Sequence, residues 1–95
     1  MYFVTSIDPK DEDYRCVGYF SDKETAIKVV ENNVGDLYEA GCYPYIVIEN
    51  IPEGLYQYDT DPLWFTYIEK TEKYQISPPP LFIRKQHHLV GFAIG

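Results

Sequence analysis

One segment of this chain carries a clear helix start signal, and it lies between runs that are typical of strands. Ser21 is followed three residues later by Glu24, which is the spacing of a capping box. Apolar residues then recur at helical spacing, at Ala26, Ile27, Val30 and Val34. The pattern predicts a helix over 22–34, capped by Ser21, with those four side chains on its buried face. The residues that follow are compatible with a short helical turn over 36–40.

Residues that favour extended backbone, the β-branched and aromatic ones, concentrate on both sides of this helix. Gly18 interrupts one of these runs and indicates a bulge or a close approach of another backbone segment. The order of elements, β-β-α-β-β-β-β, predicts an α+β fold in which an antiparallel sheet of five to six strands carries the helix on one face. The predicted strands span 2–7, 14–20, 43–49, 63–68, 73–76 and 89–94, with a short extended piece over 55–58.

Length and charge together describe a single small acidic domain. Ninety-five residues support one core, so 1–95 forms one domain. No apolar run reaches the ~18 residues of a membrane helix, and two cysteines without CxxC spacing are typical of reduced thiols in a cytoplasmic protein. The formal net charge of −7 disfavours direct binding of nucleic acid. The partners that remain are a basic protein surface and a small molecule in a local pocket.

Motifs for catalysis and metal binding are sparse. The sequence contains no GxGxxG, GxxxxGK[ST], HExxH or GxSxG. His87 and His88 are adjacent, so on a strand they point to opposite faces, and no third ligand is spaced to join them. We therefore expect a protein that is not an enzyme and that uses neither a metal nor a cofactor.

Aromatic rings are the most unusual feature of the composition. Ten tyrosines are more phenols than a small core can hide, so some must line a pocket or an interface. Such rings stack on nucleobases or anchor protein contacts, and a subunit interface explains them equally well. The sequence has two arginines, Arg15 and Arg84, and a guanidinium can bind a phosphate group while an aromatic ring stacks on a base. We predict a ligand site formed by Arg15, Tyr45, Trp64, Tyr67, Arg84 and His87.

Several stretches resemble one set of short proteins. The resemblance rests on MYFVTSIDPKD at 1–11, RCVGYF at 15–20, ENNVGDLYE at 31–39, VIE at 47–49 and FAIG at 92–95. The proteins in this set are small open reading frames of phages, prophages and their bacterial hosts. The resemblance implies the cytoplasm of a phage-infected bacterium. Small phage proteins there antagonise host defence, some as sponges for nucleotide immune signals and others as acidic anti-CRISPR proteins.

The leading hypothesis is a non-enzymatic sponge that sequesters a small anionic nucleotide-like ligand. A domain of this size has little depth for a private pocket, so we expect a homodimer or larger homo-oligomer to share one. The alternative is an acidic inhibitor that docks onto the basic nucleic-acid groove of a host protein. A third possibility is an accessory domain of a mobile element. The acidic residues that the alternative would use are Asp8, Asp11, Glu12, Asp13, Asp59 and Asp61.

Overall fold

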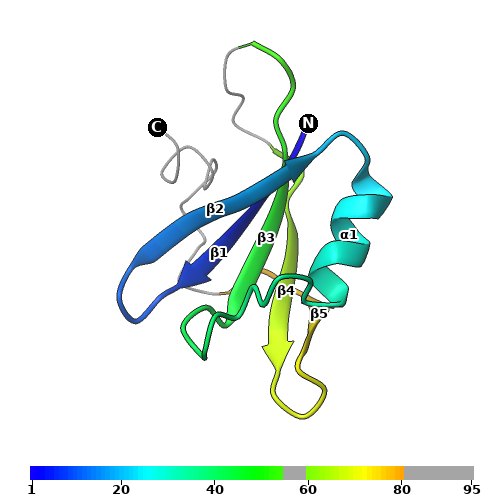
Figure 1. Cartoon of the computed structure of the whole chain (residues 1–95). Coiled ribbons are helices and arrows are strands. Elements are labelled where there is room, and N and C mark those ends of the chain that lie inside the picture. The colour runs from blue at the N-terminus through cyan, green and yellow to red at the C-terminus, as the bar shows by residue number, and fades with distance from the viewer. Residues whose placement is uncertain (55–59, 81–95) are drawn as a thin grey trace.

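The computed structural model describes residues 1–54 and 60–80 (Figure 1). One helix and five strands follow one another as β1 (Tyr2–Asp8), β2 (Asp13–Phe20), α1 (Lys23–Glu31), β3 (Tyr45–Asn50), β4 (Leu63–Ile68) and β5 (Lys73–Ser77). The strands form one antiparallel sheet in the order β2-β1-β3-β4-β5. The predicted α+β class and antiparallel sheet are confirmed. The strand predicted over 89–94 and the extended piece over 55–58 lie outside the described residues.

Strand β3 occupies the centre of the sheet, between β1 and β4. Its consecutive apolar residues Ile46, Val47 and Ile48 are all at most 1% exposed. Because successive side chains on a strand point to opposite faces, such a run requires cover on both sides. The strand starts at Tyr45 and not at residue 43, because Pro44 has no N–H to donate to a ladder.

The helix begins one residue later than its capping-box spacing predicts. Asp22 is the N-terminal cap, and its carboxylate accepts from the Thr25 backbone N–H at 3.0 Å and from the Thr25 hydroxyl at 2.8 Å. The prediction of Ser21 as the cap is therefore wrong. A carboxylate accepts both donors at once and also places negative charge at the positive end of the helix.

The helix also ends earlier than predicted, at Glu31. Asn33 adopts a left-handed backbone conformation with φ 48°, and this turns the chain away from the helix axis. Val34 consequently leaves the apolar face and is 56% exposed, whereas Ala26 and Val30 are fully buried against the sheet. The short helical turn predicted over 36–40 is a series of turns and not a helix.

Two clusters of buried side chains lie on the two faces of the sheet. The face opposite α1 carries Ile7, Val47 and Trp64, and Tyr14 and Tyr45 pack against them. The cluster on the face that α1 covers is larger and contains Val4, Ala26, Val30, Ile46, Ile48, Phe65 and Tyr74. The helix-covered face therefore holds the main core.

A bulge in β2 decides which face Arg15 occupies. Val4 pairs with Gly18, but the next residue, Thr5, pairs with Cys16, so Val17 is an extra residue. The bulge predicted near Gly18 is confirmed. If regular pairing continued from Val4 and Gly18 without a bulge, Arg15 would pair with Ile7 and share its face. With it, Arg15 pairs with Ser6 and lies on the helix side of the sheet.

The strand directions bring three connections to one end of the sheet. They are the β1–β2 turn (9–12), the loop from α1 to β3 (32–44) and the β4–β5 turn (69–72). In Figure 1 all three lie at the lower end, and the N-terminus lies at the upper end. Segments far apart in sequence thus form one surface.

Candidate functional site

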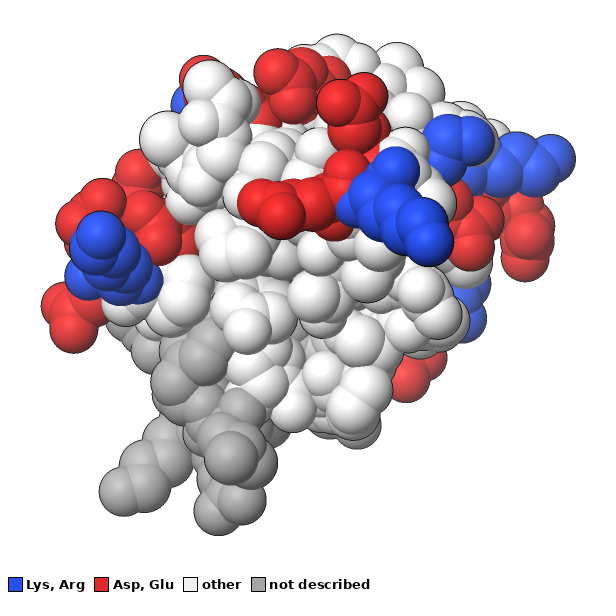
Figure 2. Space-filling view, turned by 90° about the horizontal axis from the view of Figure 1, so that it is seen from below, with Lys and Arg blue, Asp and Glu red and all other residues white. Residues whose placement is uncertain are grey.

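The lower end of the molecule, which we call the acidic end, carries most of the negative charge that lies on connections. Eight of the fifteen acidic residues belong to the three connections or to the strand ends beside them, together with four basic residues. Figure 2 views this end, where acidic side chains lie among basic and uncharged ones. The acidic residues are Asp8, Asp11, Glu12, Asp13, Asp36, Glu39, Glu69 and Glu72, and the basic ones are Lys10, Arg15, Lys70 and Lys73.

Hydrogen bonds fix the loop over 32–44 against the rest of this end. The side chain of Asn33 donates to the Glu72 carbonyl at 3.3 Å and accepts from the Leu37 N–H at 2.5 Å. The Ser6 hydroxyl donates to the Leu37 carbonyl at 3.5 Å. The loop is thus tied both to β1 and to the β4–β5 turn. Asp36 and Glu39, which both have left-handed backbone conformations, are exposed beside these hydrogen bonds.

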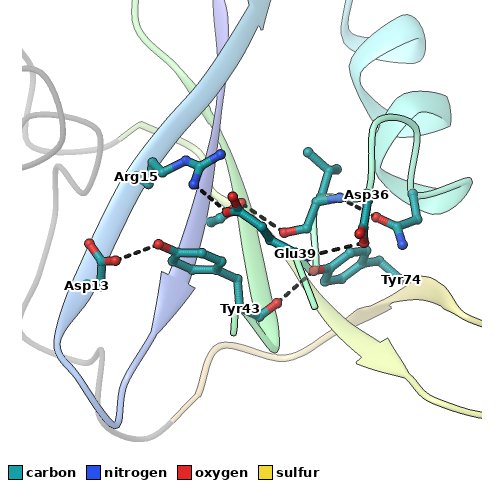
Figure 3. A network of polar contacts seen from close by, with 9 residues as sticks. Asp13, Arg15, Asp36, Glu39, Tyr43 and Tyr74 are labelled. Atoms are coloured by element: carbon teal, nitrogen blue, oxygen red, sulfur yellow. Dashed lines mark hydrogen bonds and ion pairs between the residues drawn. The ribbon is translucent and has the colours of Figure 1, made fainter. Parts of the chain in front are cut away.

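Arg15 lies in a network of polar contacts between β2 and the loop (Figure 3). Its guanidinium forms an ion pair with Glu39 and lies 5.6 Å from the centre of the Tyr43 ring. The Tyr43 hydroxyl donates to the carboxylate of Asp13. That bond, together with burial, raises the pKa of Tyr43. The positive charge of Arg15 is therefore already balanced by a carboxylate and placed over an aromatic ring.

Tyr74 connects this network to the core. It is 3% exposed, and its hydroxyl donates to the Tyr43 carbonyl at 2.7 Å. Burial raises the pKa of Tyr74 far above its ordinary value, because the charged phenolate would lose its hydration. The acidic end is thus attached to the interior by a neutral, buried hydrogen bond.

A cleft of about 670 Å³ lies between the loop and the β4–β5 turn. Two of its walls are the rings of Tyr38 and Tyr67, which stack on each other with centroids 3.5 Å apart and planes 9° from parallel. Tyr67 also meets the ring of Tyr74 edge-on at 5.3 Å. The charged residues that line the cleft are Asp36, Glu69, Glu72 and Lys73.

The cleft has a negative electrostatic environment. Burial raises the pKa of the Tyr67 phenol, and the charges of Glu72, Asp36 and Glu69 raise it further. In the described part of the chain, Arg15 and Glu39 form the one ion pair, so no cation pairs with the three carboxylates of the cleft. The arrangement suits a positively charged group and repels an anion.

The four predicted ligand residues that the structure describes lie at three different places. Arg15 belongs to the polar network and Tyr67 to the cleft. Tyr45 and Trp64 lie on the opposite face of the sheet, where Trp64 is only 4% exposed. The two other predicted residues, Arg84 and His87, lie outside the described residues.

Sequence reasoning missed four residues of the cleft. Tyr38 and Asp36 fell within a segment interpreted as helical, and Glu69 and Glu72 flank a turn that drew no functional interpretation. The signal that could have identified these residues was the topology of the chain. Once the helix and the hairpin over 63–76 are placed on one sheet, the helix C-terminus and the hairpin turn must lie at the same end.

A buried carboxylate on the opposite face also escaped prediction. Glu49 is 1% exposed and accepts from the Thr60 hydroxyl at 2.8 Å. The Asn50 N–H donates to the Thr60 carbonyl at 2.8 Å, so this pair attaches the start of the second described range to the end of β3. We assign Glu49 and Thr60 to the architecture of the sheet.

Comparisons with known proteins do not extend this description. No protein-family model matches the chain, and no curated protein or solved structure matches it significantly. Within 1–54 and 60–80, no three or more His, Cys, Asp or Glu side chains are grouped so as to hold a metal ion. No helix in the same ranges has the length and apolar character to cross a membrane.

Proposed function

We propose that this protein is a non-enzymatic binding protein whose acidic end docks onto a basic protein surface, such as a groove that binds nucleic acid. The observation that carries the proposal is the convergence of three separate connections, with eight carboxylates, at one end of the sheet. Charge gathered in this way steers a basic partner toward one face and fixes its orientation.

The ion pairing of the charged residues at this end supports the same proposal. Arg15 is paired with Glu39, whereas Asp36, Glu69 and Glu72 surround a cleft and pair with no cation in the described residues. An exposed surface on which carboxylates outnumber basic groups complements a basic surface better than it complements a phosphate.

Nucleotide capture, the leading hypothesis from the sequence, stays a prediction. Two of its residues, Arg84 and His87, lie outside the described residues, and the cleft beside Tyr67 is acidic. The phage setting, the cytoplasmic location and the homo-oligomer also stay predictions. In that setting, an acidic protein that occupies a nucleic-acid groove would inhibit a host protein.

Two matched variants test the proposal. The first carries Glu69→Lys with Glu72→Lys at the acidic end, and the second carries Glu24→Lys with Glu53→Lys at the opposite end. All four residues are exposed, and both variants change the net charge equally. Each immobilised protein is exposed to the heparin-binding proteins of a bacterial lysate, and bound proteins are displaced with duplex DNA.

The wild type and the Glu24/Glu53 variant should retain the same proteins and release them to DNA, and the Glu69/Glu72 variant should not. Equal retention by both variants would contradict the proposal. A parallel melting experiment with a panel of signalling nucleotides tests the other hypothesis, since a bound nucleotide raises the Tm. A nucleotide-induced shift without DNA-displaceable retention would replace the proposal with nucleotide capture.

A further inference from the structure

We infer that the cleft between the loop over 32–44 and the β4–β5 turn binds the guanidinium of one arginine side chain of the partner. This inference rests on the proposed function, because it names the group by which a basic surface would be anchored at the acidic end. The cleft is large enough for a side chain, at about 670 Å³, and it is built by two segments that the Asn33–Glu72 hydrogen bond holds together.

The cleft is rich in hydrogen-bond acceptors. Carboxylates of Asp36, Glu69 and Glu72 line it, and one oxygen of Asp36 already accepts from the Glu39 N–H at 3.1 Å. The hydroxyls of Tyr38 and Tyr67 have no hydrogen-bond partner in the described structure, so their oxygens also remain available. A guanidinium offers five N–H donors in one plane and can satisfy several acceptors at once.

The aromatic walls favour a planar cation over a compact one. Tyr38 and Tyr67 form a stacked pair, and Tyr74 contacts the ring of Tyr67 edge-on. A guanidinium packs against aromatic rings and is weakly hydrated, whereas an ammonium keeps its water more strongly. The cleft therefore favours arginine over lysine.

Charge balance in the cleft still requires a cation. Three carboxylates and the ammonium of Lys73 line it, so the lining residues carry an excess of negative charge. Glu72, Asp36 and Glu69 all lie close enough to raise the pKa of the Tyr67 phenol, whose ring also lines the cleft. A positively charged group that enters would reduce this repulsion.

Titration of the ¹⁵N-labelled protein with blocked tripeptides tests the inference. The central residue is arginine, lysine or citrulline, and citrulline keeps the shape of arginine without its charge. Spermidine serves as a fourth probe, because a free polyamine could offer a similar positive charge. The readout is the saturable shift of the amides of residues 32–41 and 69–73.

We expect saturation with the arginine peptide, an affinity about threefold lower for lysine, and no saturable shift with citrulline. Glu69→Gln with Glu72→Gln should lower the arginine affinity about tenfold, and Glu24→Gln with Glu53→Gln should leave it unchanged. No saturable shift with arginine, an equal response to citrulline, or tighter binding of spermidine than of arginine would each overturn the inference.

The two proposals fail in distinguishable ways. If basic proteins are retained and displaced by DNA while the arginine peptide does not bind the cleft, the acidic end docks partners without this anchor. If the arginine peptide binds the cleft but basic proteins are retained equally by both charge-reversal variants, the cleft is a cation site and the proposed function is wrong.

Discussion

The two ends of the sheet differ in what their connections expose. The acidic end gathers carboxylates on three connections, with a cleft walled by Tyr38 and Tyr67. At the opposite end, a hollow of about 600 Å³ is lined mainly by apolar groups, from Met1, Phe3, Tyr19, Ile51, Pro52, Glu53 and Gly54. The cleft at the acidic end is polar with rings beside carboxylates, and the hollow at the opposite end is apolar with a single carboxylate, that of Glu53.

The two ends of this small domain would therefore bind partners by different physical effects. Tyr19 is 65% exposed beside Phe3, with ring centroids 5.8 Å apart, and Glu53 is the one charged side chain among the described residues that line the hollow with them. Binding at the apolar hollow would depend on buried area, and binding at the acidic end would depend on charge. Experiments that change only one of these quantities can therefore identify which end binds.

The largest expected effect comes from the core on which both ends are built. Phe65 is fully buried in the helix-side cluster. Phe65→Ala should lower the free energy of unfolding by about 3–5 kcal/mol, because it removes a ring and leaves a cavity. Chemical denaturation measures the change. A loss below ~1 kcal/mol would mean that the ring is not part of a close-packed core.

The next largest effect is expected from salt on the affinity for a basic peptide. It directly separates binding at the acidic end from binding at the apolar hollow. Between about 0.05 and 0.5 M salt, the affinity for an arginine-rich peptide should fall about tenfold, because screening weakens attraction between exposed charges. Fluorescence anisotropy of a labelled peptide measures it. An affinity that is constant across this range would favour the apolar hollow as the binding end.

The buried hydrogen bond from Tyr74 to Tyr43, beneath the acidic end, should contribute a smaller amount to the free energy of unfolding. Tyr74→Phe removes the donor to the Tyr43 carbonyl and should lower the free energy of unfolding by about 1 kcal/mol. Binding of the arginine-rich peptide by the folded variant should be unchanged. If binding falls together with stability, the network also positions the acidic end.

Alkaline pH should lower the free energy of unfolding through Tyr74. Folding raises the pKa of Tyr74, so the folded state keeps a proton that the unfolded chain loses near pH 10. The stability that this tyrosine supplies is fully present below about pH 10 and is lost as the pH rises further. Denaturation at about pH 8 and pH 10.5 should show the fall, and Tyr74→Phe should reduce it. An equal fall in the variant would assign the effect to other groups.

The smallest effect is expected at the apolar end. Tyr19→Ser changes an exposed ring and should alter the free energy of unfolding by less than about 0.5 kcal/mol. It should leave the affinity for the arginine-rich peptide unchanged. A clear loss of affinity would move the binding surface away from the acidic end.

Local signals in the sequence predicted the elements well, because they depend on neighbouring residues. The strand predicted over 43–49 is present as β3, and Gly18 indicated the bulge. The helix ends were less predictable. Ser21 and Asp22 are both residue types that cap helices well. Which of them does so depends on where the backbone becomes helical, and here the side chain of Asp22 reaches the Thr25 N–H.

The candidate site was less predictable, because it depends on strand order and face. Trp64 and Tyr67 are three residues apart on one strand, so alternation sends them to opposite faces, and a site cannot use both rings. The side of the sheet that Arg15 occupies depends on the one extra residue at Val17. Neither the strand order nor the position of this extra residue follows from composition.

A map of amide shifts across both ends tests the central claim most directly. The ¹⁵N-labelled protein is titrated with an arginine-rich peptide at constant salt. We expect the shifts to concentrate in 9–12, 32–44 and 69–72, the three connections of the acidic end. Shifts concentrated instead around the apolar hollow at Met1, Phe3 and Tyr19 would contradict the account.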